Sequence, residues 1–175
     1  LVLGKPLGVG IQSAALKKNL LDAAGYQAMV AATTQLNRPG AALSQLAGVH
    51  ALTDVTGFGL LGHSLELARG AQLTAHLDMQ ALPVLPGVME LAQQGVFTGA
   101  SGRNWASYGD AVQLASSITD AQRALLTDPQ TSGGLLVSCT PETVDQVLDI
   151  FRSSGFAQAA VVGRMQAGAA QVHVA

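Results

Sequence analysis

Short stretches of the chain alternate between apolar and polar residues, and this period of two predicts strands. The predicted strands cover residues 1–3, 49–54, 73–78, 133–139, 159–165 and 170–174. The stretch 133–139 is read as a buried strand, with apolar residues at 135–137. The last two strands flank a turn at residues 166–169, so we expect them to form a hairpin.

Apolar residues three or four positions apart predict helices between these strands. The stripes consist of Tyr26, Met29, Val30, Thr33 and Leu36; Leu43 and Leu46; Leu61, Leu65 and Ala68; Val88, Leu91 and Ala92; Tyr108, Val112, Ala115 and Ile118; and Val144, Val147, Leu148 and Phe151. Two helices are expected before the strand at 49–54. Gly70 is expected to end the helix that follows this strand, and residues 119–122 match a capping box. This order of elements predicts an α+β fold with a mixed or antiparallel sheet.

Composition narrows the class of protein. The chain has 175 residues, 49% hydrophobic and only 11% charged, against about 25% charged in an ordinary soluble domain. We therefore expect a single domain over residues 1–175, with part of its surface covered by other protein. The net charge of −2 and the scattered basic residues predict no nucleic-acid partner, and no apolar run predicts a membrane span. The lone Cys139 and the lack of a signal peptide favour a cytoplasmic protein.

Residues 53–63, TDVTGFGLLGH, are the most informative segment, and they allow three interpretations. In the first, Gly57, Gly59 and Gly62 form the G-x-G-x-x-G of a dinucleotide-binding unit, with Asp78 near the ribose. Two observations weaken it. The preceding strand alternates instead of being continuously apolar, and Asp54 would lie beside a negatively charged pyrophosphate.

In the second interpretation, Asp54 at the end of the strand holds Mg²⁺, while the hydroxyl of Thr56 and the amides at the start of the next helix receive phosphate oxygens. One carboxylate is too few for a complete Mg²⁺ site, so further ligands must come from elsewhere. In the third, Asp54 or Thr56 only caps the helix, and the glycines permit close packing.

Residues 127–136 form a second glycine-rich segment, in which Asp128, Thr131 and Ser132 are candidate ligand-binding groups. The first loop covers residues 4–10 and contains three glycines, and its Lys5 is a further candidate for binding a phosphate. A structural turn and a solvated lysine are the alternatives. The four histidines lack the spacing of a zinc site, and Cys139 lies in a predicted buried strand, where we expect a core residue rather than a nucleophile.

Several motifs together resemble the C-terminal half of a selenophosphate synthetase (selenide, water dikinase), within the aminoimidazole ribonucleotide synthetase-like superfamily. They are residues 5–8 (KPLG), 37–40 (NRPG), 50–63 (HALTDVTGFGLLGH), 82–83 (LP), 85–87 (LPG) and 128–136 (DPQTSGGLL). The resemblance implies a layered α+β domain in which helices cover the sheet. It also implies a parent enzyme that converts selenide, ATP and water into selenophosphate, AMP and phosphate, with Mg²⁺ on the nucleotide.

The resemblance assigns the role of metal ligand to Asp54 and places Thr56 and Gly57 near the phosphates. The family's N-terminal half carries the catalytic cysteine or selenocysteine, a lysine and further metal ligands, and nothing in these residues matches them. We therefore expect no catalytic residue in this chain, no activity from it alone, and a homodimer for the full-length protein. A dinucleotide-binding oxidoreductase domain and a non-catalytic interaction domain are the alternatives.

Overall fold

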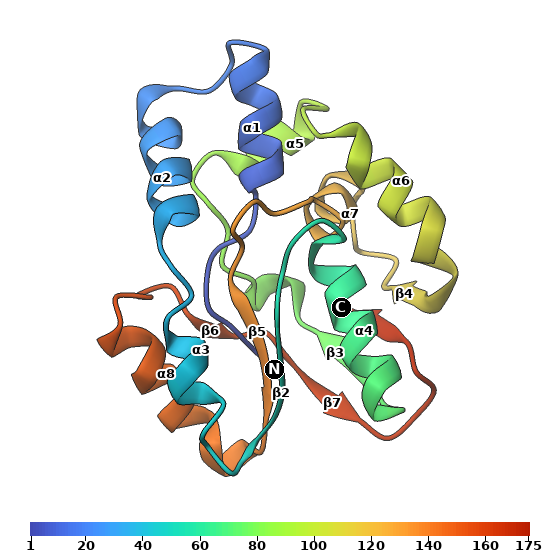
Figure 1. Cartoon of the computed structure of the whole chain (residues 1–175). Helices are drawn as coiled ribbons and strands as arrows, with labels where there is room; N and C mark the ends of the chain where they lie inside the picture. Colours follow the sequence, from blue (N-terminus) through green and yellow to red (C-terminus); the bar gives the residue numbers. More distant parts are fainter.

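The chain forms two four-stranded sheets that share one main hydrophobic core (Figure 1). The computed structural model describes residues 1–175. The strands are β1 (Val2–Leu3), β2 (Val49–Asp54), β3 (Thr74–Leu77), β4 (Val112–Leu114), β5 (Leu135–Cys139), β6 (Ala160–Val161), β7 (Gly163–Gln166) and β8 (Val172–Val174). Four of the six strand pairings are antiparallel. The predicted α+β class is confirmed, with the expected single sheet divided into two.

The first sheet has the order β2-β5-β1-β6 and is antiparallel throughout. Successive side chains of β1 point to opposite faces of the sheet, so they pack into two different hydrophobic clusters. Val2 packs with the residues under the last helix, whereas Leu1 and Leu3 face the main core. β2 is one of the two edge strands, paired only with β5, so its last residue, Asp54, lies at an open edge of the sheet.

The second sheet has the order β4-β8-β3-β7, and it shows that the predicted terminal hairpin is wrong. β7 pairs antiparallel with one edge of β3, and β8 pairs parallel with the other edge. The alternation in residues 159–174 correctly indicated extended chain, but it carries no information on the partner. β3 is mostly buried, so the amides and carbonyls of both its edges need partners, and the two late strands supply them.

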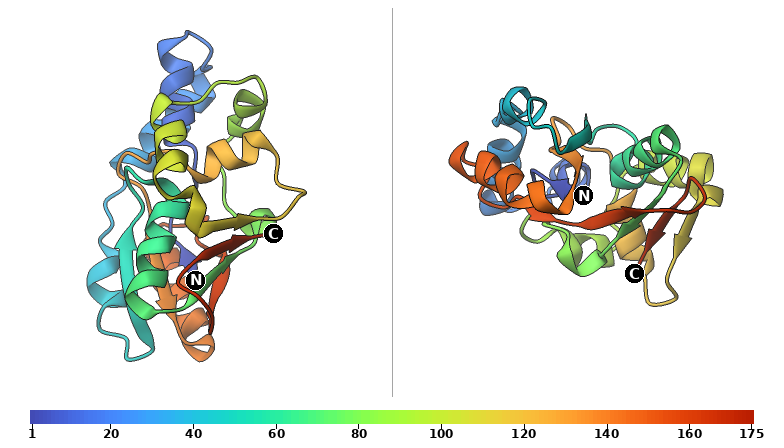
Figure 2. Two further views of the ribbon diagram at one scale, coloured as in Figure 1. Left: turned by 90° about the vertical axis from the view of Figure 1, so that its right-hand side faces the viewer. Right: turned by 90° about the horizontal axis from the view of Figure 1, so that it is seen from below.

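Helices cover both sheets (Figures 1 and 2). They are α1 (Val9–Lys17), α2 (Ala23–Thr34), α3 (Pro39–Leu43), α4 (Gly59–Ala71), α5 (Val88–Gln93), α6 (Gly99–Tyr108), α7 (Asp120–Leu126) and α8 (Val144–Ser153), with short 3-10 turns at Met79–Ala81, Gly109–Ala111 and Pro141–Thr143. α3 and α8 lie together beside the first sheet, at the lower left of Figure 1. α4 contacts β2 and also packs on the second sheet through β3 and β8. None of these helices has both the length and the apolar character that crossing a membrane requires.

Three helix predictions need correction. Three helices, not two, precede β2, because α1 follows the first loop directly. The expected helix through Tyr108 and Ile118 does not form; α6 ends at Tyr108, and after a 3-10 turn the chain continues as β4. The apolar residues of this stretch have helical spacing only by coincidence, because Tyr108 belongs to the end of a helix and Val112 to the strand that follows. α4 extends past Gly70 to Ala71, and Gln72 takes the left-handed conformation, with φ 54°.

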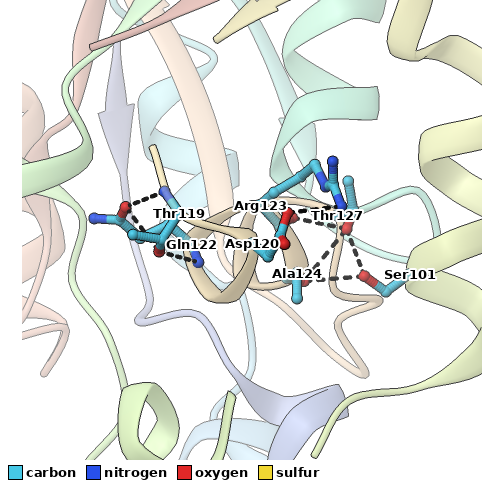
Figure 3. Close-up of polar contacts among 7 residues, drawn as sticks. All are labelled: Ser101, Thr119, Asp120, Gln122, Arg123, Ala124 and Thr127. Atoms are coloured by element: carbon cyan, nitrogen blue, oxygen red, sulfur yellow. Dashed lines mark hydrogen bonds and ion pairs between the residues drawn. The ribbon is translucent and has the colours of Figure 1, made fainter. Parts of the chain in front are cut away.

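The short helix α7 is held at both ends (Figure 3). Its predicted capping box is confirmed, with the side chains of Thr119 and Gln122 bonding to each other's backbone amides. At the other end, the hydroxyl of Thr127 lies 2.5 Å from that of Ser101 on α6. This contact fixes the point at which the chain leaves α7 for the second glycine-rich segment.

Candidate functional site

The loop between β2 and α4 presents the predicted metal ligand to solvent. Asp54 ends β2 and is exposed, and its carboxylate makes no hydrogen bond or ion pair within the chain. Val55 is buried and anchors the loop, and its amide donates to the carbonyl of Gly134 at 2.9 Å. The carboxylate is therefore held on a fixed backbone but left free.

The carbonyl oxygens of the next three residues all point into the protein. They accept hydrogen bonds from the amide of Gln130 to Thr56 (3.0 Å), from the side chain of Asn104 to Gly57 (2.9 Å) and from the hydroxyl of Tyr108 to Phe58 (2.6 Å). Burial raises the pKa of Tyr108, and a backbone hydrogen bond at Gly62 offsets part of that effect. The loop is thus fixed by donors from α6 and from the second glycine-rich segment.

The amides of Thr56, Gly57 and Phe58 donate no hydrogen bond within the chain. A Cβ added at Gly57 would meet nothing within 4 Å, so packing inside the chain does not explain a glycine there. Gly59 differs: its φ is +69°, and a Cβ would lie 2.7 Å from the backbone of Thr127. Three free amides beside a residue without a side chain form a surface that can receive an anion.

The N-terminus of α1 is a useful contrast, because the chain itself fills it. The side chain of Gln130 accepts hydrogen bonds from the amides of Gly8 and Val9, and Asp128 Oδ2 accepts from those of Gly10 and Ile11, all at 2.9–3.2 Å. Asp128 is fully buried, and burial raises its pKa to about 7, although bonds from Ile11, Gln130 and Gly10 act in the opposite direction. Asp128 therefore caps a helix inside the protein and has no open side toward a ligand.

Lys5 is also committed to the fold. It is 2% exposed, and its ammonium donates to the carbonyls of Ala32 (3.0 Å), Gln35 (2.6 Å) and Ser132 (2.7 Å). Burial without a carboxylate partner lowers its pKa. All three of its protons are in use, so it ties the end of α2 to the second glycine-rich segment rather than offering a donor to a phosphate.

The structure brings the two glycine-rich segments side by side. A Cβ at Gly133 would collide with the carbonyl of Val55, and the amide of Gln130 donates to the carbonyl of Thr56. Thr131 and Ser132 are exposed within this neighbouring segment, and Ser132 has φ 53°. Five of the candidates are therefore at least partly accessible on these two neighbouring segments, namely Asp54, Thr56, Gly57, Thr131 and Ser132.

Sequence reasoning missed a hydrogen-bonded chain behind Thr56. Its hydroxyl lies 3.2 Å from His63 Nε2, and His63 Nδ1 lies 2.8 Å from a carboxylate oxygen of Glu66. His63 is 6% exposed, and the ring of Phe58 packs against it at 5.9 Å between centroids. The signal was available in the sequence, since His63 and Glu66 are three positions apart in a predicted helix and so share a face.

The candidate site is an open surface and is not enclosed by other parts of the chain. Four cavities of the chain are lined by residues other than Asp54, Thr56 and Gly57. No three His, Cys, Asp or Glu side chains lie close enough to hold a metal ion. Cys139 is half-buried and packs against the smaller hydrophobic core, as expected of a structural residue, and burial raises the pKa of its thiol, which is contrary to what a nucleophile needs.

The dinucleotide alternative is wrong. A βαβ unit needs two parallel strands of one sheet on either side of its helix. Here β2 is an antiparallel edge strand, and the strand after α4 belongs to the other sheet. Asp78, the expected ribose ligand, instead caps the following 3-10 turn by accepting from the amide of Gln80 at 2.9 Å.

The fold and the loop together define a layered α+β domain with an open, glycine-rich loop in which three free amides follow a free carboxylate. The chain belongs to the AIR synthase related protein, C-terminal domain family, whose profile matches residues 1–175. It is 76% identical over 174 residues to a selenide, water dikinase from Pseudomonas straminea, and 68% identical over 175 residues to one from Burkholderia orbicola. These alignments cover 99% and 100% of this chain but 49% of each relative, so the chain spans about half the length of the curated relatives it matches. The resemblance noted from the motifs is confirmed.

Solved structures agree with the fold. Hydrogenase maturation protein HypE, also solved in complex with ATP, matches 99% of this chain with a TM-score of 0.70 at 18% identity. Thiamine-monophosphate kinase from Stenotrophomonas maltophilia matches 99% of the chain with a TM-score of 0.63, also at 18% identity. The chain covers 46–49% of those chains. At such identity the likeness establishes the fold alone.

Proposed function

We propose that this chain is the C-terminal domain of an ATP-dependent selenophosphate synthetase, which converts selenide, ATP and water into selenophosphate, AMP and phosphate. Its part is to supply one side of the site that holds the phosphates of Mg·ATP. The observation that carries the proposal is the loop after β2, with its free carboxylate, its three free amides and its glycine open to solvent. The identity to selenide, water dikinases supports the choice of reaction.

Each loop residue has a proposed role. Asp54 holds Mg²⁺, for which a carboxylate oxygen is a suitable hard ligand. The open amides of Thr56 and Gly57 receive phosphate oxygens, and the exposed Thr131 and Ser132 lie on the neighbouring segment. Asp128 and Lys5 support this surface from within, because their polar atoms are already bonded to the chain's own backbone.

One carboxylate cannot hold Mg²⁺ alone, so the remaining ligands would come from ATP and from the other half of the full-length protein. The nucleophile would also come from that half. We therefore expect no selenophosphate from this chain by itself, and measurable turnover by the chain would contradict this expectation. A cytoplasmic location, a single domain over these residues and a homodimer of the full-length protein belong to the same proposal.

Calorimetric titration tests the site directly. The chain and its Asp54→Ala variant are titrated with Mg·ATP and with NAD, alone and after addition of the N-terminal half. Asp149→Ala is the matched control, because Asp149 is an exposed carboxylate on α8, beside α3 and remote from the loop in sequence.

We expect Mg·ATP binding, weak or dependent on the second half, that is lost in Asp54→Ala and kept in Asp149→Ala. Micromolar NAD binding that Asp54→Ala leaves untouched would overturn the proposal. If neither nucleotide binds even with the second half present, the interaction-domain alternative stands instead.

A further inference from the structure

The hydrogen-bonded chain behind Thr56 determines what its hydroxyl can offer to a ligand. Three groups are joined in series, namely the hydroxyl of Thr56, the imidazole of His63 and the carboxylate of Glu66. His63 is nearly buried, yet both of its ring nitrogens have partners, whereas Nε2 of His173 is buried with none. The imidazole of His63 is thus fixed in orientation from both sides.

The positions of the protons follow from the partners. An ionised carboxylate only accepts hydrogen bonds, so Nδ1 of His63 must carry the proton that Glu66 accepts. The side chain of Glu66 is 54% exposed, so water can solvate its charge. In a neutral imidazole protonated at Nδ1, Nε2 has a lone pair and no proton. With the ring in this neutral form, the hydroxyl of Thr56 donates its only proton inward to Nε2, whereas a doubly protonated ring would donate from Nε2 to Thr56.

A hydroxyl that donates inward presents only lone pairs outward. Such an oxygen can bind a cation or accept from a water molecule on that cation, but it cannot donate to a phosphate oxygen. The free amides of Thr56, Gly57 and Phe58 lie in the same loop and can only donate. The loop therefore has two kinds of binding group, with acceptors at Asp54 and the Thr56 side chain and donors along the backbone.

We infer that His63 and Glu66 are positioning residues that fix the Thr56 hydroxyl as an acceptor for the hydrated cation of the site, rather than as a donor to phosphate. This inference rests on the proposed function and refines it, because it assigns the phosphate to the backbone amides and the cation to the side chains of Asp54 and Thr56.

The first test needs no activity. Two-bond nitrogen–proton correlations in the histidine-labelled chain identify which ring nitrogen of His63 carries the proton, and His63→Gln assigns the signals by removing them. We expect a single form at neutral pH, protonated at Nδ1 and bare at Nε2. In Glu66→Gln the side-chain amide can donate to Nδ1, so the proton should move partly or wholly to Nε2. A proton on Nε2 in the unmodified chain would overturn the inference.

The second test separates the cation from the phosphate in the full-length protein. The affinity for Mg²⁺ is measured at a fixed nucleotide concentration, and the affinity for the nucleotide is measured at saturating Mg²⁺. We expect Thr56→Val and His63→Gln to raise the Mg²⁺ concentration for half-maximal binding about tenfold, as is typical when a supporting partner of a metal site is lost. Nucleotide affinity at saturating Mg²⁺ should change less than about twofold, because these variants leave the backbone amides that receive the phosphate in place. Thr56→Ser should restore binding, and His50→Gln, at an exposed position of β2, is the control.

The outcomes distinguish this inference from the proposed function. If Thr56→Val weakens nucleotide binding at saturating Mg²⁺ as much as it weakens Mg²⁺ binding, Thr56 is a phosphate donor and the inference fails while the proposed function stands. If Asp54→Ala also leaves both affinities unchanged, the proposed function itself fails. Urea unfolding of each variant shows whether it is folded, and Thr56→Ser keeps the test valid if Thr56→Val is not.

Discussion

Replacing Asp128 by asparagine should change how the stability of this chain depends on pH. The side chain is fully buried at the start of α1, and Oδ1 has no hydrogen-bond partner while Oδ2 accepts from Gly10 and Ile11. Burial raises the pKa from 3.8 to about 7 in the folded chain. An asparagine in the same place keeps an acceptor oxygen for the two amides and has no charge to bury.

The sign and size of this pH effect on stability follow from the linkage between proton binding and folding. Below pH 3.8 the carboxyl is protonated in both states and has no effect. Between about pH 4 and pH 7 the folded chain holds a proton that the unfolded chain has released, so stability falls as the pH rises. Each pKa unit is worth 1.36 kcal/mol, so a difference of about 3 amounts to about 4 kcal/mol above pH 7.

Urea unfolding followed by circular dichroism at pH 4, 5.5, 7 and 8 measures the effect. We expect the free energy of unfolding of Asp128→Asn, relative to the unmodified chain, to increase by about 4 kcal/mol from pH 4 to pH 8. Asp149→Asn, at an exposed position of α8, should show no such trend. The reasoning would be refuted if this difference in the free energy of unfolding did not change with pH, or if the unmodified chain became the relatively more stable one as the pH rises. Either result would show that the hydrogen bonds from the amides to the carboxylate outweigh the cost of burying its charge.

Three further substitutions test the support of the candidate site. Lys5→Met should lower the free energy of unfolding by about 3 kcal/mol, because the carbonyls that Lys5 now binds lose their donors inside the protein; a loss under 1 kcal/mol in urea unfolding would contradict this. Gly133→Ala should fail to accumulate as folded protein or lose several kcal/mol, since its Cβ collides with the carbonyl of Val55, and a normal unfolding curve would refute it. Gly57→Ala should keep or slightly raise stability but weaken Mg·ATP binding; unchanged binding in calorimetry would remove Gly57 from the site.

The sequence predicts the loop after β2 well because its determinants are local. A strand that alternates up to Asp54, a glycine-rich turn and a helical stripe through Leu61 and Leu65 lie within about twenty residues. No distant partner is needed to place the carboxylate at the end of the strand. For the same reason the capping box at Thr119 could be found from its four residues alone.

Most of the features that could not be predicted from the sequence depend on distant pairs. Asp128 is 118 positions from Gly10, whose amide it accepts, and Lys5 is 127 positions from Ser132. No local pattern indicates that either side chain is used inside the protein. The partners of β3 were missed for the same reason, since period two marks a strand but not its neighbours. The direction of the Thr56 hydrogen bond requires the fold, because the loop must first bring it against α4.

The position of β1 bears on the order in which this chain can fold as it is synthesised. β1 precedes the other strands of its sheet along the chain, yet it lies inside the sheet between β5 and β6, with Val2 opposite both Val137 and Val161. These partners are far along the chain, so closing the sheet requires long loops, which makes folding slow. The segment that carries Lys5 therefore stays unpaired and apolar until both β5 and β6 have left the ribosome. In that interval it is exposed to association with other chains, and a bound chaperone or an already folded preceding segment would protect it.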